Sequence, residues 1–281
     1  MARWDRITNR GNVEDRRGRS SGPVVAGGVG GLGIIGILLA LFLGGGSGME
    51  DILNQLQAQA PQQQIDQGEF EGMDEYEDFA SRVVGSSDET WAAIFSANGR
   101  TYGEPRLVLF RDVTQSGCGG ANSQVGPHYC PLDETIYLDE TFFDEVLSRF
   151  GAEGGDVAEA YVIAHEVGHH VQNELNIMDE VQRLQQGSSQ AEANDLSVRL
   201  ELQADCFAGV WANSIRDTVD LAPEIGEAID AAEAVGDDRI QETVQGRVNP
   251  ESWTHGSSEQ RVDWFTRGYE SGDPAQCDTF G

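Results

Sequence analysis

Apolar residues recur at helical spacing through most of the chain beyond residue 73. Two shorter runs rich in branched and aromatic residues, 106–111 and 135–138, are typical of strands. The Gly-, Cys- and Pro-rich stretch 116–131 between them is typical of a loop. The pattern predicts a predominantly helical α+β fold. Helices are expected near residues 74–84, 88–97, 140–150, 190–216, 223–235 and 258–270, with a central one that begins at residue 156.

Polar residues at two positions predict where helices begin. Asp156, with Glu159 three residues later, is expected to cap the central helix, and Ser257 with Gln260 the last one. Apolar residues at helical spacing predict which face of the central helix, and which face of helix 190–216, is buried in the core. These residues are Val157, Tyr161, Ala164, Val167 and Val171 in the first, and Leu196, Leu200, Phe207 and Trp211 in the second.

Residues 24–43 contain no charged side chain, and twenty such residues in a helix span about 30 Å, the thickness of a bilayer core. The sequence therefore predicts one N-terminal transmembrane helix. Its six glycines are tolerated in membranes, and the pair Gly27 and Gly31 favours a homodimer through this helix. A cleaved signal peptide is the alternative, although no A-x-A-like site follows the apolar run.

The charge is distributed unevenly. Residues 1–23 form a basic segment with six Arg and three acids, which the positive-inside rule places in the cytoplasm. Residues 44–72 form a Gly- and Gln-rich linker that cannot fold alone. These boundaries predict a folded domain at 73–281 on the extracytoplasmic side of the cytoplasmic membrane.

The net charge of −30, with no Lys, makes the body strongly acidic. Such a surface does not bind nucleic acid by neutralising phosphates. A solvated acidic surface accounts for the charge, and a high-salt habitat is compatible with it.

Four cysteines, an even number outside the cytoplasm, suggest disulfides with three connectivities. Pairing Cys118 with Cys130 within one loop is the simplest choice, which leaves Cys206 to join Cys277. Free buried thiols are the alternative. A cysteine metal site is disfavoured, because the chain has no C-x-x-C spacing.

The segment His165-Glu166-Val167-Gly168-His169 carries the clearest chemical pattern. Histidines at i and i+4 project from one helix face and can bind one Zn²⁺. Glu166 then reaches the zinc-bound water as general base, and Gly168 leaves room for close approach. His170 points about 100° away and is not expected to be a ligand.

A catalytic zinc site needs a third protein ligand. Glu201 on the second long helix is the candidate, and Asp205 one turn later can accept the free N–H of a ligand histidine. Zinc is argued from ligand type, and Mn²⁺ or Co²⁺ are alternatives.

The segments AYVIAHEVGHHVQ, ELQADCFAGVWA, THGSSEQRVDWFTRGYESG and CDTF, with the GCG…GPHYCP loop, resemble the bacterial neutral zinc metallopeptidase family over nearly the whole chain. The Glu201-x-x-x-Asp205 element also resembles gluzincins. The resemblance implies a gluzincin-like zinc metallopeptidase domain, one Zn²⁺, a peptide or protein substrate and a membrane anchor.

Other polar residues receive provisional roles. His255, in a loop before the last helix, is the candidate to donate to the oxyanion, with a structural role as the alternative. Arg261 is a candidate clamp for a substrate carboxylate. His128 is expected to be structural. The strand 135–138 is expected at an edge above the zinc helix, where it would align an extended substrate.

Three functions remain open at this level. The first is an endopeptidase in which Glu166 deprotonates the attacking water. The second is a zinc-binding, membrane-anchored module without proteolytic activity. The third is a metal hydrolase that acts on a cell-envelope amide. The complete ligand set together with a general base favours an enzyme, because a structural zinc site has four protein ligands and needs no base.

Overall fold

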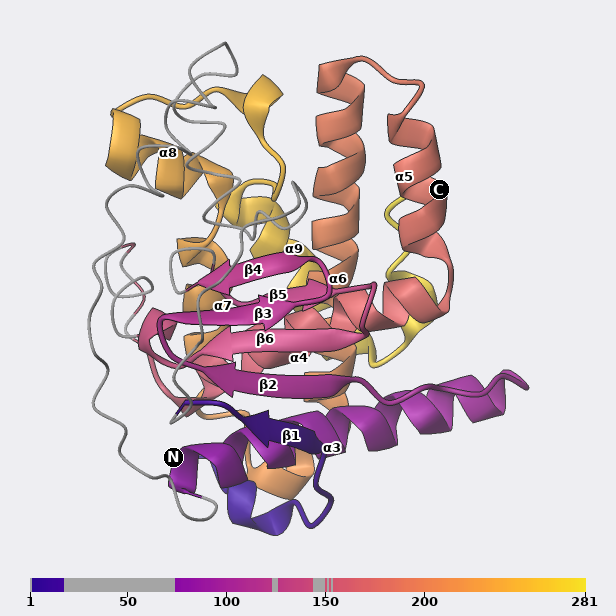
Figure 1. Ribbon diagram of the computed structural model, residues 1–281, viewed down its shortest axis with the longest axis vertical. Helices are drawn as coiled ribbons and strands as arrows, with labels where there is room; N and C mark the ends of the chain where they lie inside the picture. Colours follow the sequence, from indigo (N-terminus) through magenta and orange to yellow (C-terminus); the bar gives the residue numbers. More distant parts are fainter. Residues whose placement is uncertain (1, 18–73, 123–125, 144–149, 151, 153) are drawn as a thin grey trace.

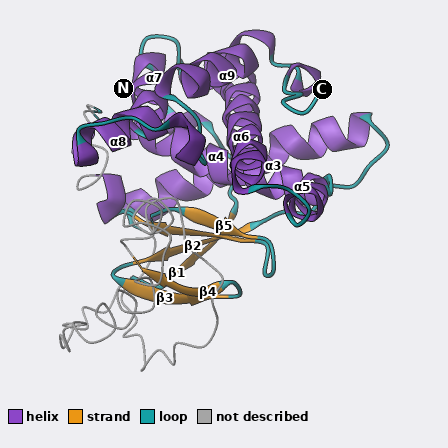
Figure 2. Cartoon of the chain, turned by 90° about the horizontal axis from the view of Figure 1, so that it is seen from above, coloured by secondary structure: helices purple, strands orange, loops and turns teal. Residues whose placement is uncertain are grey.

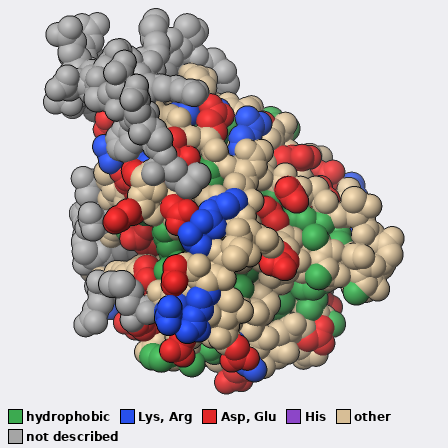
Figure 3. All heavy atoms as spheres, turned by 90° about the horizontal axis from the view of Figure 1, so that it is seen from below, with side chains coloured by type: hydrophobic (Ala, Val, Ile, Leu, Met, Phe, Trp, Pro, Cys, Tyr) green, Lys and Arg blue, Asp and Glu red, His purple; other side chains and the backbone are tan. Residues whose placement is uncertain are grey.

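The computed structural model describes residues 2–17, 74–122, 126–143, 150, 152 and 154–281. Figure 2 shows these residues in two parts, with the helices gathered on one side and the strands on the other. The predominantly helical α+β class is therefore confirmed. Acidic side chains and arginines lie interspersed on the face seen in Figure 3, as expected for the solvated surface of an acidic protein.

A mixed four-stranded sheet has the order β1-β2-β6-β5. β1 and β6 both run parallel to β2, and β5 runs antiparallel to β6. Strands β3 and β4 form a separate antiparallel hairpin. The bounds are β1 Asn12–Asp15, β2 Arg106–Phe110, β3 Val113–Ser116, β4 Gly119–Asn122, β5 His128–Cys130 and β6 Thr135–Asp139.

Both faces of the two central strands are buried. Leu107 and Leu109 of β2 belong to the main core, which the helices share. Val108 and Phe110, which point to the opposite face, belong to a smaller core with Ala121 of the β3–β4 hairpin. This burial on two sides explains why β2 reads as a continuous apolar run.

Two helices predicted at 74–84 and 88–97 are a single helix, α3 (Glu75–Ala97), capped by Asp74. The polar residues between them suggested a break, but Ser86 and Ser87 each donate a hydrogen bond to Val83 O inside the helix.

The predicted loop 116–131 also contains strand residues of β3, β4 and β5. Backbone pairing therefore overrode a composition that is typical of loops.

Helices α4 (Asp156–Glu174), α6 (Gln190–Val219) and α9 (Ser258–Ser271) form a central group, and the remaining helices lie around it. The capping box predicted at Ser257 and Gln260 is present, and a second one forms at Ser189 and Glu192. The sequence did not predict α5 or α8. The bounds are α4 Asp156–Glu174, α5 Ile177–Gln185, α6 Gln190–Val219, α7 Ile225–Ala234, α8 Asp237–Gln245 and α9 Ser258–Ser271, with short 3-10 turns at Trp4–Arg6, Pro250–Ser252 and Pro274–Gln276.

Helices α6 and α9 pack backbone against backbone. A Cβ atom at Gly209 would lie 2.1 Å from Phe265 O, and one at Gly268 would lie 2.0 Å from Cys206 O. Only glycine fits at either position, because real Cβ atoms do not approach so closely. The contact fixes α9 along the helix that carries Glu201.

Both expected disulfides are present, Cys118–Cys130 and Cys206–Cys277. The first joins the hairpin region to β5. The second joins α6 to the C-terminal tail across 71 residues of sequence, so it constrains a long loop of the unfolded chain.

The strand expected at an edge is an interior strand. β6 lies between β2 and β5, so both of its sides are hydrogen-bonded. The edge on that side is β5, whose hydrogen bonds to β6 were not predicted. Among the described strands, β5 is therefore the outermost one on this side of the sheet.

Residues 2–17, here called the N-terminal arm, belong to the folded body. β1 pairs with β2, and Trp4 is buried in the main core. The predicted division between a segment at 1–23 and a domain at 73–281 is therefore wrong for these residues. Burial of Trp4 and sheet pairing outweigh the tendency of an Arg-rich terminus to remain solvated.

The predicted transmembrane helix 24–43 and the linker 44–72 lie outside the described residues, as does most of the predicted helix 140–150. Among the residues that the structure does describe, no helix has the length and apolarity needed to span a bilayer.

Asp88 on α3 makes the stability of the fold dependent on pH. Burial raises the pKa of its carboxyl from 3.8 to about 7, the charge of Glu104 adds to this effect, and the hydrogen bond from Tyr102 opposes it. The folded state therefore holds this proton more tightly than the unfolded state, and its stabilising effect is lost as the pH rises from about 4 through about 7.

Replacement Asp88→Asn removes this ionisation. We expect the variant to gain stability over the wild type at about pH 8, on the order of 3 kcal/mol, and to gain little at about pH 4. Urea unfolding at both pH values measures the difference, with Asp230→Asn at an exposed position as control. An equal effect of Asp88→Asn at both pH values would contradict the assignment.

Candidate metal centre

Helix α4 carries the two histidines. Its N-cap is Gly155, and Asp156 is the first helical residue, so the predicted cap is displaced by one position. The Asp156 carboxylate instead accepts a hydrogen bond from Trp4 Nε1 at 2.8 Å. One turn apart on α4, the buried rings of His165 and His169 have centroids separated by 4.8 Å. The expected common face is confirmed.

Close approach of α4 and α6 brings the third ligand to this face. A Cβ atom at Gly168 would lie 2.9 Å from Ala204 O, so a larger residue would separate the helices. At this spacing the Glu201 carboxylate meets both rings. Oε2 lies 3.2 Å from His165 Nε2, and Oε1 lies 3.4 Å from His169 Nε2.

The other nitrogen of each ring has a partner inside the protein. His165 Nδ1 lies 2.8 Å from Asp205 Oδ1, as the sequence predicted. His169 Nδ1 lies 2.9 Å from Gln172 Oε1, and the Gln172 amide donates to Leu200 O at 2.7 Å. Gln172 was missed, although its position three residues after His169 is a usable signal. With Nδ1 engaged, the Nε2 atoms are left for a metal.

Asp205 has no exposed surface, and two side chains in addition to His165 compensate its charge with three hydrogen bonds. Tyr161 donates its hydroxyl at 2.6 Å, and Arg261 donates from Nε at 2.8 Å and from Nη2 at 2.9 Å. The predicted role of Arg261 as a clamp for substrate is therefore wrong, because its guanidinium is bound to Asp205. Tyr161 is buried as expected and also orients this carboxylate.

Electrostatic interactions within the group oppose the effect of burial. Burial lowers the pKa of His165, but the charge of Asp205 and hydrogen bonds to Asp205 and Glu201 raise it to about 10. Burial raises the pKa of Glu201, whereas the charge of His169 and hydrogen bonds from both histidines lower it well below its ordinary value. Metal ligands must be deprotonated, so metal affinity should fall as the pH is lowered.

His165, His169 and Glu201 offer three ligand atoms that all lie within 4.8 Å of one another. Two imidazoles and one carboxylate are a donor set that suits zinc and that leaves a fourth position open. The hydrogen bonds to Asp205 and Gln172 hold the rings in the orientation that such a site needs. The residues present therefore fit one Zn²⁺.

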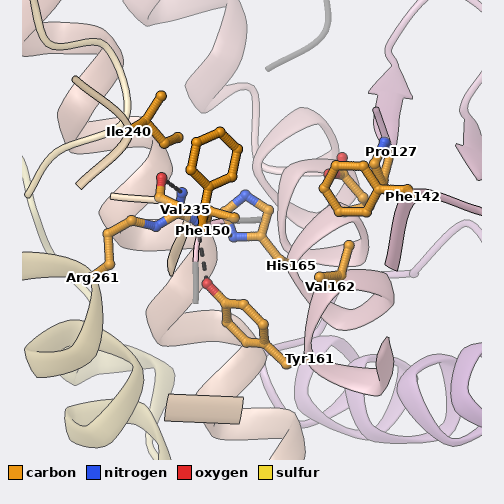
Figure 4. Close-up of a pocket in the computed structure, with 10 residues that line it drawn as sticks. Pro127, Phe142, Phe150, Tyr161, Val162, His165, Val235, Ile240 and Arg261 are labelled. Atoms are coloured by element: carbon orange, nitrogen blue, oxygen red, sulfur yellow. Dashed lines mark hydrogen bonds between the residues drawn. The ribbon is translucent and has the colours of Figure 1, made fainter. Parts of the chain in front are cut away.

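Glu166 is 2 % exposed, and its Oε1 atom has no hydrogen-bond partner in the described part of the chain. A buried carboxylate without partners is costly, so its retention points to a role toward a bound group. Glu166 and His165 line a small pocket whose other walls are mostly apolar. In Figure 4, Pro127 and Phe142 lie on one side of this cavity, and Phe150, Val235 and Ile240 lie on the other.

His255 is buried, and it lies near enough to Glu201 that a positive charge on its ring would help to lower the pKa of that carboxyl. Its Nδ1 lies 3.0 Å from Thr254 Oγ1 and 3.4 Å from Asp237 Oδ1. Asp237 Oδ2 also accepts the backbone N–H groups of Thr254, His255 and Gly256. Asp237 begins α8, a helix that the sequence did not predict, so this partner was missed.

The two other histidines stay outside the group of ligands. His170 Nδ1 lies 3.0 Å from Tyr129 Oη and its Nε2 lies 2.7 Å from Gly103 O, which confirms that it is not a ligand. His128 stacks on Tyr137 in β6, which agrees with a structural role.

Fold and site together define a helical α+β domain with an HExxH helix, to which a second helix adds a glutamate in one metal-binding group. The chain belongs to the family described as "Putative neutral zinc metallopeptidase", whose match covers residues 2–280.

Two relatives are similar to this chain over long stretches of sequence. The chain is 47% identical over 288 residues to the "Uncharacterized protein YpfJ" of Escherichia coli (strain K12), with 99% of each chain covered. It is 47% identical over 206 residues to the "Uncharacterized protein Rv2575" of Mycobacterium tuberculosis (strain ATCC 25618 / H37Rv), with 69% of this chain and 67% of that protein covered. No solved structure matches the chain.

The compensation of Asp205 predicts a large effect at Arg261. Replacement Arg261→Gln leaves a buried carboxylate short of its cation, and we expect a loss of about 3–5 kcal/mol in unfolding free energy. The exposed Arg267 on the same helix is the control, because Arg267→Gln should change stability little.

The milder Tyr161→Phe should keep the fold and weaken zinc binding roughly tenfold in a competitive chelator titration. Unchanged zinc affinity in Tyr161→Phe would contradict the role given to this hydroxyl.

Proposed function

We propose that this protein is a zinc-dependent endopeptidase. The observation that carries the proposal is the buried carboxylate of Glu166, whose Oε1 has no hydrogen-bond partner among the described residues, beside the group formed by His165, His169 and Glu201. A structural metal site has no use for such a group, whereas hydrolysis requires a base close to the metal.

The residues of the chain have distinct tasks in this reaction. A bound Zn²⁺ supplies a Lewis acid that polarises the scissile carbonyl and lowers the pKa of water. Glu166 takes a proton from the attacking water at its free Oε1 atom and later returns it to the leaving amine. Asp205 and Gln172 hold the ring orientation of the two histidines throughout.

His255 supports the same reaction as a donor to the oxygen on which negative charge develops. Its buried ring is oriented by Asp237, which in turn is fixed by three backbone N–H groups. A donor held in this way needs no reorganisation during the reaction. Asp237 therefore acts as a positioning residue for His255.

The small apolar pocket beside Glu166 favours a substrate with an apolar side chain next to the scissile bond. Its walls include Phe142, Val162 and Ile240, and the charge of Arg261 is already neutralised by Asp205. An anionic substrate side chain would find no free cation among the described residues of this pocket and would be costly to desolvate. An aliphatic or aromatic one gains by leaving water.

We further infer that the domain acts on the extracytoplasmic side, held at the cytoplasmic membrane by residues 24–43. Two disulfides support an oxidising compartment, because cytoplasmic thiols are kept reduced. The apolar run 24–43 supports attachment to a membrane.

Replacement Glu166→Gln tests the central proposal. We expect the variant to keep one zinc per chain by elemental analysis and to lose peptide cleavage by at least about 10²-fold, because the ligands remain and the base is removed. Cleavage is measured on casein, on unstructured peptides and on a peptide that contains a cell-wall amide. Zinc retention without cleavage of any substrate by the wild type would favour a binding module, and cleavage of the cell-wall amide alone would favour an envelope hydrolase.

Replacement Ile240→Asn tests the apolar cavity. We expect kcat/KM to fall about tenfold or more for a peptide with Phe or Leu beside the scissile bond, because the wall becomes polar. For a matched peptide with Ala at that position, kcat/KM should change little. Val244→Asn, at an exposed position of the same helix, is the control variant. Equal losses for both peptides would argue against a side-chain pocket at this place.

A further inference from the structure

The N-terminal arm, residues 2–17, completes the sheet of the metal-binding domain. β1 pairs in parallel with β2 in a register that runs from Asn12 opposite Arg106 to Asp15 opposite Leu109. Figure 1 shows β1 at the end of the sheet beside α3. Without the arm this side of β2 would be an unpaired edge that exposes backbone donors and acceptors.

The start of the arm is held in the helical core. The ring of Trp4 packs edge-on against Phe79 and stacks on Trp211, with centroid distances of 5.2 and 6.4 Å. Its Nε1 donates to Asp156, the first residue of the helix that carries the metal ligands. The backbone of the next turn is bound to the guanidinium of Arg82, which donates to Ile7 O. These contacts show that the start of the arm is packed in the core of the domain.

The arm also packs against α3 without intervening side chains. A Cβ atom at Gly85 would lie 2.7 Å from the backbone of Arg10, and Gly11 N donates to Ser81 O at 2.8 Å. Arg10 in addition forms an ion pair with Asp78 at 2.8 Å. The glycine at each contact shows that the two backbones are fitted to one another.

The end of the arm meets the start of the rest of the domain. Arg17 is 6 % exposed, and its guanidinium lies 2.9 Å from the carboxylate of Asp74, the residue that caps α3. The same guanidinium is paired with Asp15 and Glu140. Arg17 and Asp74 are therefore neighbours in space although residues 18–73 separate them in the sequence.

We propose that residues 2–17 and 74–281 lie on the same face of the membrane. A segment that crosses a bilayer once leaves its two ends on opposite faces, about 30 Å of hydrocarbon apart. A single crossing between Arg17 and Asp74 cannot be combined with an ion pair of 2.9 Å and a shared sheet. The arrangement also disfavours loss of the arm with a cleaved signal peptide, because the sheet and core would lose β1 and Trp4.

The test uses the full-length chain in intact cells. All cysteines of the described residues are in disulfides, so an added cysteine is labelled selectively by a membrane-impermeant maleimide. Thr8→Cys reports on the arm and Gln182→Cys on α5, and both positions are exposed. We expect the two variants to be labelled to the same extent and under the same conditions.

A second pair of variants tests the contact itself. Asn12→Cys with Arg106→Cys places two cysteines on neighbouring strands, about 4.8 Å apart, within the Cα separation of a disulfide. After oxidation of isolated membranes we expect this pair to form a cross-link. The control Asn12→Cys with Gln182→Cys should form none, since α5 and β1 lie far apart in Figures 1 and 2.

Each outcome decides the matter. Labelling of both single variants from outside, with the cross-link, supports the proposal. Protection of both until the membrane is permeabilised, with the cross-link, also supports it and overturns only the extracytoplasmic location. Labelling of Gln182→Cys with loss of labelling at Thr8→Cys, or absence of the cross-link, overturns the same-face arrangement.

Discussion

The buried charge of Asp205 is the group on which the metal site depends, because an uncompensated carboxylate in this position would be too costly to keep. Arg261 and Tyr161 compensate it from α9 and α4, which leaves its remaining hydrogen bond for His165. The three central helices are thereby joined around one anion. The backbone contact between α6 and α9 at Gly209 and Gly268 supports the same arrangement, since it sets the position from which Arg261 reaches Asp205.

The position of the three ligands depends on the close approach of α4 and α6. Gly168 lies inside the HExxH segment, where its missing side chain admits Ala204 and so brings Glu201 to the two histidines. The glycine therefore serves the packing of the second helix as well as leaving room near the metal. The pocket that Glu166 and His165 line has mostly apolar walls, and electrostatic interactions are stronger in such surroundings.

The N-terminal arm packs against the sheet and against the helix that carries the two histidines. Trp4 contacts Asp156 at the start of α4, while β1 covers β2 on the side away from β6. A basic terminal segment thus became an internal part of the domain, although its arginines are typical of a cytoplasmic flank. Its arginines form ion pairs with carboxylates at the start of α3, as the pairs of Arg10 with Asp78 and of Arg17 with Asp74 show.

The sequence by itself determined the fold class, the HExxH helix, Glu201 with Asp205, and both disulfides. These features depend on short-range periodicity, on ligand spacing along helices and on a small number of cysteines. Only the tertiary structure decided the contacts of Arg261, Gln172 and Asp237, the interior position of β6 and the packing of the arm. Those depend on which distant segments meet, and a buried ion pair such as Arg261 with Asp205 leaves no periodic signal in either helix, because each charge is acceptable only once the other is in place.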